Sequence, residues 1–105
     1  MQNDSEQKDL YLKIHKSDKE VLIAVCDCDL MGKRFVENGL QIEINREFFG
    51  DMKASGLDME LALKSATIAN FVGRKCVQHA IHLGYVDEKN VLIIDGVYCA
   101  QMVRM

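Results

Sequence analysis

Asn70 is the polar residue whose surroundings in the sequence most need an explanation. It lies in the run Ala66-Thr67-Ile68-Ala69-Asn70-Phe71-Val72-Gly73, with apolar residues on both sides. A buried amide that finds no hydrogen-bond partner costs roughly 1–3 kcal/mol. We therefore expect Asn70 either to satisfy backbone groups near the end of an element or to recognise a ligand or partner in a cleft.

Thiols and imidazoles are the other groups that could do chemistry. The sequence has four cysteines, and two of them form the C-x-C motif Cys26-Asp27-Cys28. No second cysteine pair follows at a spacing typical of zinc sites. On a helix, each step from Cys76 to His79 and on to His82 turns by about 60°, so Cys76 and His82 point in different directions, which does not suit a shared metal. The sequence thus predicts no metal site and no cofactor, and the default for Cys26, Cys28, Cys76 and Cys99 is a reduced structural thiol.

Basic and amide side chains give a short list of candidate contact residues. Arg74 and Lys75 share a polar arc with Gln78, His79 and His82, which is either a solvated face or a binding surface for phosphates or an acidic partner. Lys33 follows a glycine and could contact phosphate. Gln101 is either a residue of a sheet edge or part of one polar cluster with Asn70. The candidate binding residues are therefore Lys33, Asn70, Arg74, Lys75 and Gln101.

No motif in the chain identifies a reaction. There is no P-loop, no G-x-G-x-x-G fingerprint and no nucleophile elbow. No catalytic residue is assigned, and a role without catalysis is favoured, although the sequence leaves the question open. A Cys/His nucleophilic pair would need a contact in space that spacing alone does not reveal.

The pattern predicts one long helix, from about residue 66 to Leu83, which ends at Gly84. In that helix Asn70 falls on the apolar arc, and Gly73 allows another backbone to approach closely. Ile68 and Phe71 lie off the main apolar stripe. They either form an exposed contact between copies of the chain or pack under residues 58–65. Those residues are expected to form a shorter helix capped by Asp58.

The remaining segments read as strands and turns. Leu10, Leu12 and Ile14 alternate with polar residues, as in a half-buried strand, and residues 21–26 resemble a central strand covered on both faces. Asn38-Gly39 and Asp95-Gly96 each predict a two-residue hairpin turn. The first places Phe35 opposite Ile42 and Arg34 opposite Glu43, and the second places Ile94 opposite Val97 and Leu92 opposite Cys99. Residues 46–49 are expected to form a short helix closed by Gly50, and residues 51–56 a loop.

Length and composition indicate one small domain of the α+β class. The chain has 105 residues, 49% of them hydrophobic and 28% charged, which suits a single packed core. We expect a disordered tail over residues 1–8. Residues 9–105 should form a mostly antiparallel sheet of about five to six strands, with two or three helices packed on one face.

The sequence also bounds the compartment and the partners. Net charge is −3, which counts against a general polyanion binder. No apolar run approaches the length of about 20 residues needed to cross a bilayer, and the first residues lack a signal-peptide core. We therefore expect a cytoplasmic protein that does not contact the membrane.

Three motifs carry a resemblance to an archaeal family known as domain of unknown function 424. They are Ala24-Val25-Cys26-Asp27 leading into Leu30-Met31-Gly32-Lys33, then residues 66–73, and finally Gly96-Val97-Tyr98-Cys99-Ala100-Gln101. The resemblance extends from Leu10 to Met105. It implies an archaeal cytosolic protein with a compact α+β fold, and it brings no activity and no catalytic residues. The family pattern usually has His where this chain has Cys99, so a role for that imidazole does not carry over.

Three functional hypotheses follow. The first is an interaction module without catalysis, binding RNA or a protein of the translation machinery through the arc at Arg74, Lys75 and His79. The second is an enzyme or small-ligand protein with a polar cleft near Asn70, Asp27 and Gln101. The third is a homo-oligomer that pairs through a sheet edge or a helix face.

Overall fold

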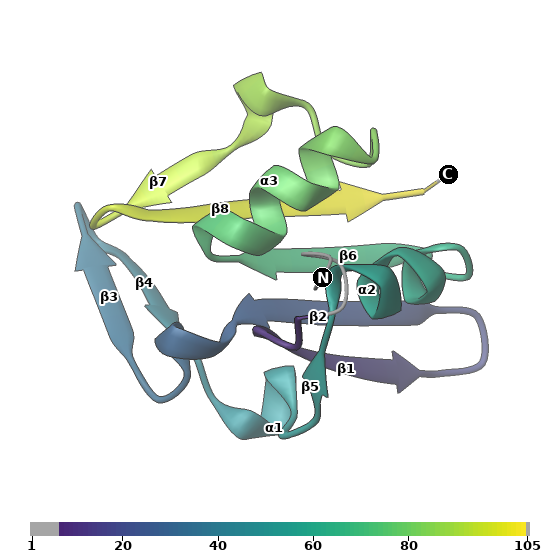
Figure 1. Cartoon of the computed structure of the whole chain (residues 1–105). Helices are drawn as coiled ribbons and strands as arrows, with labels where there is room; N and C mark the ends of the chain where they lie inside the picture. Colours follow the sequence, from purple (N-terminus) through teal and green to yellow (C-terminus); the bar gives the residue numbers. More distant parts are fainter. Residues whose placement is uncertain (1–6, 105) are drawn as a thin grey trace.

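The computed structural model describes residues 7–104 (Figure 1). The expected tail over residues 1–8 falls mostly outside this range, since residues 1–6 are not among the described residues. Gln7 and Lys8 are exposed and precede the first strand.

A six-stranded sheet in the order β5-β1-β2-β6-β8-β7 forms the centre of the molecule. Its strands are β1 (Leu10–Lys16), β2 (Val21–Asp27), β5 (Lys53–Ala54), β6 (Ile68–Val72), β7 (Leu92–Ile94) and β8 (Val97–Val103). All neighbouring strands are antiparallel except β2 and β6, which run parallel. The sheet is therefore mostly antiparallel, as expected.

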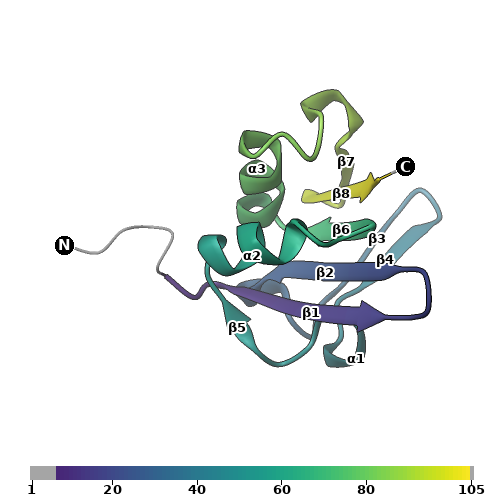
Figure 2. The ribbon, with the colours of Figure 1, turned by 90° about the vertical axis from the view of Figure 1, so that its right-hand side faces the viewer.

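Helices cover one face of this sheet, and a hairpin with a short helix covers part of the other (Figure 2). Helices α2 (Gly56–Leu63) and α3 (Arg74–His82) pack on the first face. The second face carries the hairpin of β3 (Arg34–Glu37) and β4 (Leu40–Glu43) together with α1 (Arg46–Phe49). Two short 3-10 turns, Cys28–Leu30 and Glu88–Asn90, complete the chain. The α+β prediction is confirmed.

Strand β2 is the centre of two hydrophobic clusters. Ile23 and Val25 point into the cluster under α2 and α3, whereas Ala24 and Cys26 point into the cluster under the hairpin and α1. All four have no exposed surface. Because both faces of β2 are covered, none of these positions faces solvent, which explains the continuous apolar sequence of the strand.

Both predicted hairpins form in the predicted register. Phe35 pairs with Ile42 in the first, and Leu92 pairs with Cys99 in the second. Asn38 and Asp95, the leading turn residues, each have a φ of 50°. Positive φ at the leading turn position, followed by glycine, is the requirement of a type I′ turn.

The expectation of one helix over residues 66–83 is wrong for its first half. Residues 68–72 form β6, and only residues 74–82 are helical. Gly73, with a φ of 117°, separates the two elements. Ala69 and Phe71 point into the cluster under the helices, and Val72 points into the cluster under the hairpin, so apolar residues occupy both faces of β6 and the strand lacks the alternation that would have marked it. Asn70 therefore lies on a strand, not on a helix.

The start of α2 also differs from the expectation. Ser55, not Asp58, caps this helix, and its Oγ accepts a hydrogen bond from the Asp58 backbone N–H at 3.1 Å. Asp58 returns the contact, because its carboxylate accepts the Ser55 backbone N–H at 2.9 Å. This reciprocal pair is a capping box with an aspartate in the third helical position. The expected loop at 51–56 contains the two-residue strand β5 and the first residue of α2.

No helix among residues 7–104 has the length and apolar character needed to cross a membrane.

Candidate functional site

Asp27 lies at the end of β2 and uses its carboxylate to begin α3. Its Oδ2 accepts the backbone N–H of Lys75 at 3.0 Å, and its Oδ1 accepts that of Cys76 at 3.0 Å. Burial raises the pKa of this carboxyl group, and the two backbone hydrogen bonds act in the opposite direction. The anion-binding position at this helix N-terminus is thus already filled by a side chain of the protein itself.

Gly73 makes room for that carboxylate. A Cβ atom at this position would lie 2.6 Å from Oδ2 and 2.7 Å from Oδ1 of Asp27. The sequence suggested that Gly73 admits another backbone, and the structure shows that it admits a side chain. Asp27 faces the helices, so it lies on the opposite face of the sheet from Asn70.

Asn70 and Gln101 are directly paired across β6 and β8. Their side chains project from the face that the hairpin covers only in part, because their neighbours Val72 and Cys99 on that face contact the hairpin cluster. Asn70 is half-buried and Gln101 is exposed. No buried side-chain nitrogen or oxygen in the described part lacks a partner, so the groups that these amides leave unpaired lie open to solvent. The two amides can therefore serve a ligand.

A groove of about 430 Å³ surrounds this pair of amides. The amide groove, as we call it, has one wall from Ile42 of the hairpin and another from Leu92 and Ile94 of β7. None of its lining residues is charged; they are Ile42, Asn70, Phe71, Val72, Asn90, Leu92, Ile94, Cys99, Ala100 and Gln101. The backbone N–H of Asp95 donates to Glu37, which ties the hairpin to the turn after β7. The pairing of β6 with β8 and the hydrogen bond between Asp95 and Glu37 together shape the amide groove.

The thiol in the amide groove is a poor nucleophile. Burial raises the pKa of Cys99 to about 11, and its Sγ lies 3.6 Å from the carbonyl oxygen of Val97. A thiol with so high a pKa is almost entirely protonated near neutral pH. Cys99 therefore contributes shape and apolar surface to the groove at neutral pH.

The four thiols are all free and do not form one site. Cys76 lies on α3 and is fully buried, and its Sγ contacts the backbone oxygens of Val72 and Gly73. Burial, with the neighbouring Asp27 carboxylate, raises the pKa of Cys26 to about 12. Within residues 7–104, no three His, Cys, Asp or Glu side chains are grouped so as to hold a metal ion.

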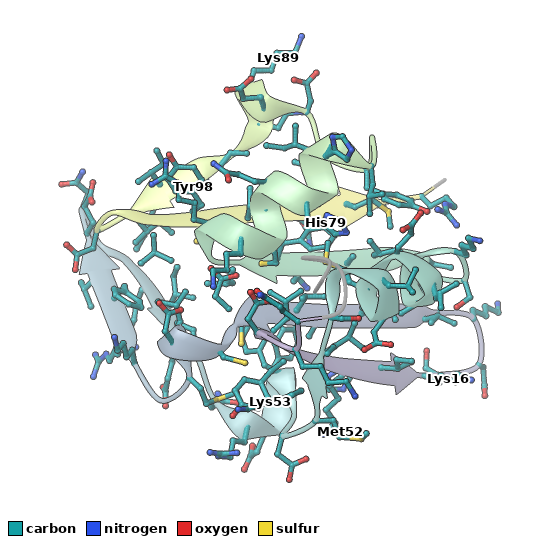
Figure 3. All side chains as sticks on the ribbon, viewed as in Figure 1. Lys16, Met52, Lys53, His79, Lys89 and Tyr98 are labelled. Atoms are coloured by element: carbon teal, nitrogen blue, oxygen red, sulfur yellow. The ribbon has the colours of Figure 1, made fainter. Side chains whose placement is uncertain are left out.

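The basic residues singled out in the sequence do not converge. Lys75 forms an ion pair with Asp9 at 3.1 Å, and the Arg74 guanidinium lies over the Tyr98 ring, 5.9 Å from its centre. The His79 ring bonds the carbonyl oxygen of Gly56 at 3.1 Å and points toward α2 (Figure 3). Lys33 is exposed at the base of the hairpin. Of the five candidate residues, only Asn70 and Gln101 line the amide groove.

A second hollow, which the sequence reasoning missed, lies along the outer side of β1. This edge groove has a volume of about 660 Å³ and is lined by residues from β1, β5, α1, α2 and the segments between them. Four of its residues are basic and two are acidic; the basic ones are Lys8, Lys13, Arg46 and Lys53, and the acidic ones are Asp51 and Asp58. These cations are spread over 46 sequence positions, so no local pattern brings them together.

Comparison with known proteins places the chain in a family. A family model described as "Protein of unknown function (DUF424)" matches residues 15–105. The chain belongs to the DUF424 family. A crystal structure of an uncharacterized conserved protein from Methanopyrus kandleri is similar to the DUF424 fold seen here, with a TM-score of 0.74 and 20% identity over 91% of this chain and 94% of that one. At this identity the likeness concerns the fold alone. No curated protein matches the sequence.

Motifs that suggested this family meet in the structure. Cys26-Asp27 ends β2 beside the end of β6, so Asp27 reaches Gly73 and the start of α3. The third motif lies on β8, where the Tyr98 carbonyl accepts the Gly73 N–H at 2.8 Å and Gln101 faces Asn70. The motifs therefore build one junction and the floor of the amide groove.

Proposed function

We propose that this DUF424 protein is an interaction module without catalysis, and that the amide groove binds a segment of a partner protein. The observation that supports this is the lining of the groove, which combines apolar walls with two adjacent amides and no charge. Such a lining suits an apolar side chain flanked by peptide groups. The two amides offer donors and acceptors that match a backbone N–H and C=O.

Exposed apolar residues of the hairpin, β7 and β8 support a protein partner further. Leu40 is 52% exposed and Leu92 is 58% exposed. Val103, on the same face of β8 as Gln101, is 58% exposed. Apolar residues grouped on one open face gain most from being covered by another apolar surface. An RNA partner fits less well, because phosphates need cations and the groove lining supplies none.

Capture of a tagged protein from a lysate of its source organism, with and without nuclease, tests the proposal. The informative variant is Leu92→Glu, which puts a charge on the groove wall. Ile93→Glu is its matched control, because Ile93 is the next residue of the same edge strand, is 55% exposed and does not line the groove. We expect partner proteins that survive nuclease, are lost with Leu92→Glu and are retained with Ile93→Glu.

Other results would contradict this function. Partners that disappear with nuclease would indicate an RNA-held contact, and partners lost equally with both variants would place the interface elsewhere. The hypothesis that the partner belongs to the translation machinery stays a prediction, and the identity of the captured proteins tests it.

A small neutral ligand is the second candidate for the amide groove. The volume of about 430 Å³ falls within the range of small-molecule sites, and the amide pair supplies directional contacts. Asp27 takes no part, since its carboxylate is committed to α3. Native mass spectrometry of the freshly purified protein distinguishes a small ligand from a partner-protein segment. A metabolite that is bound to the wild type and absent from Gln101→Leu would favour the small ligand.

A further inference from the structure

We propose that the edge groove along β1 is a second binding site, which takes an acidic segment of a partner protein in extended conformation and adds it to the sheet as a strand. This site lies at the opposite edge of the sheet from β7 and does not depend on the function proposed for the amide groove. Positive charge, an open strand edge and exposed apolar side chains support this site.

The edge groove concentrates positive charge on a protein whose net charge is −3. The two ion pairs among residues 7–104 join Lys75 to Asp9 and Lys89 to Asp87, so neither uses a cation of the groove. The Lys13 ammonium donates a hydrogen bond to the backbone oxygen of Glu47 at 2.9 Å. Arg46 lies over the Tyr11 ring at 5.9 Å. These contacts hold the two side chains in place, and no carboxylate in the described part of the chain pairs with either of them.

The acidic residues of the groove offset this charge only in part. Asp58 is engaged with Ser55 in the cap of α2, and hydrogen bonds from Ser55 lower the pKa of Asp58. Four basic residues against Asp51 and Asp58 leave a surplus of two positive charges in the lining. A ligand with carboxylates at regular spacing would complement that surplus.

The backbone of β1 provides an unpaired edge beside these charges. Strand β5 pairs with β1 only at Leu10 and Tyr11, and the N–H of Leu12 then donates to the Met52 carbonyl on the outer side. Backbone groups alternate in direction along an antiparallel strand, so the N–H and C=O of Ile14 also point outward. Within the described residues no other strand pairs with this part of β1. An extended peptide can bond there by strand addition.

Apolar side chains complete the site. Ile14 is 46% exposed and Met52 is 73% exposed, and both line the edge groove together with the half-buried Leu12. Lys16 lies at the end of β1, and Met52 and Lys53 lie at the other end of the same margin (Figure 3). A strand that alternates acidic and apolar residues would present carboxylates to the cations and apolar groups to these anchors. A nucleic acid would use the charge but not the unpaired backbone, and the groove lining holds no aromatic side chain for a base to stack on.

Fluorescence anisotropy with defined probes tests this inference. The probe is a labelled octapeptide of alternating glutamate and valine. Its controls are a charge-reversed lysine–valine octapeptide, an acidic octapeptide with proline in place of the valines, and octauridylate. We expect only the glutamate–valine peptide to bind well, since proline removes the N–H groups that strand addition needs. Tighter or equal binding of octauridylate or of the proline peptide would overturn the proposal.

Charge variants locate the site on the protein. Lys53→Glu and Lys13→Glu should each weaken binding roughly tenfold, since each replaces an attraction with a repulsion. Lys89→Glu is the matched control, because Lys89 is exposed at the far end of the molecule from Lys53 (Figure 3). Leu92→Glu should bind the peptide like the wild type, which separates this site from the amide groove. Equal weakening by Lys89→Glu would refute the assignment.

Hydrogen exchange tests the strand addition itself. The Ile14 amide should exchange fast in the free protein and roughly tenfold or more slowly with the peptide bound, because a new hydrogen bond protects it. The Lys13 amide, which points toward β2, should be protected in both states. Peptide binding that leaves Ile14 unprotected would show a purely electrostatic contact and would overturn the inference.

Discussion

Asp27 illustrates how one side chain sets the limits of a functional site. Among residues 7–104, its carboxylate is the only side chain that caps the start of α3, because Gly73 at that position has no side chain. The negative end of the group meets the positive end of the helix, which is favourable. The same contact occupies the helix N-terminus, which is a position that favours anions.

Replacing Asp27 with alanine should destabilise the protein. Asp27→Ala leaves the buried backbone N–H of Cys76 and the part-buried backbone N–H of Lys75 without this acceptor, which costs about 1–3 kcal/mol. Urea denaturation at neutral pH measures this loss. Asp29→Ala is the control, since Asp29 is exposed in the same segment. Equal losses for the two variants would show that the α3 cap contributes nothing.

Cys99 should react slowly with alkylating reagents. Its pKa of about 11, against an ordinary value of 9.0, leaves about a hundredfold less thiolate at pH 8. Iodoacetamide labelling followed by mass spectrometry gives the rate, and the same protein in urea is the reference. Labelling of native Cys99 as fast as in urea would contradict the pKa and the burial from which it arises.

At the scale of elements, local sequence predicted the hairpins and failed at β6. A two-residue turn depends on neighbours in the chain, so Asn38-Gly39 and Asp95-Gly96 specify their strands directly. Strand β6 depends on β2, whose residue Val21 bonds Thr67 from 46 positions away. Helical and strand periodicity cannot be told apart in a short segment that is apolar on both faces.

The candidate site was predictable to the same extent. Asn70 and Gln101 could each be selected as polar residues in apolar surroundings, but their pairing required the register of β6 and β8. Gly73 could be recognised as a position that needs glycine, but the sequence did not show that the group packed against it is the Asp27 carboxylate. The edge groove had no local signal, because Lys8, Lys13, Arg46 and Lys53 come from four separate segments.

The junction between β6 and α3 should tolerate no side chain at Gly73. Gly73→Ala combines a strained positive φ with a clash against the Asp27 carboxylate, and it should cost about 2–4 kcal/mol. Gly84→Ala is the control, because Gly84 has a φ of 86° but nothing near the added atom. We expect it to cost only about 1 kcal/mol in thermal unfolding. Similar costs for the two variants would remove the clash from the explanation.

The cap of α2 predicts a pH dependence. Ser55→Ala removes the Oγ acceptor and should cost about 1 kcal/mol at pH 7. Hydrogen bonds from Ser55 lower the pKa of Asp58 below 3.8 in the folded state. The stability from Asp58 is therefore complete above that value and is lost as pH falls through the folded pKa. As pH falls through that folded pKa, the difference in unfolding free energy between wild type and Ser55→Ala should become smaller, as measured by urea denaturation at each pH. A difference that grows would contradict this linkage.

For the whole molecule, the sheet separates two grooves at opposite edges. The amide groove lies under β7 and β8, and the edge groove lies beside β1 and β5. Neither groove shares a lining residue with the other. The protein could thus hold two partner segments at the same time, as an adaptor does.

The two surfaces should act independently. In a double variant, Lys53→Glu should abolish most peptide binding at the edge groove and Leu92→Glu should abolish partner capture at the amide groove. The double variant should bind the glutamate–valine octapeptide with the same free energy as Lys53→Glu alone, within about 0.5 kcal/mol, as expected for distant sites without shared contacts. Isothermal titration of the single and double variants with that peptide measures this difference. A larger coupling would mean that the sheet transmits a change between its edges.

The parallel pairing of β2 with β6 has a consequence for synthesis of the chain. The hairpins can close as soon as their own residues leave the ribosome, whereas Val21 must wait for Thr67, 46 positions later, before the centre of the sheet is joined. Closing so long a loop delays folding, because chain entropy is lost before the central contacts form. Until then, the edge of β2 that pairs with β6 stays open. The nascent protein should therefore be most prone to aggregation, and most dependent on chaperones, during this interval.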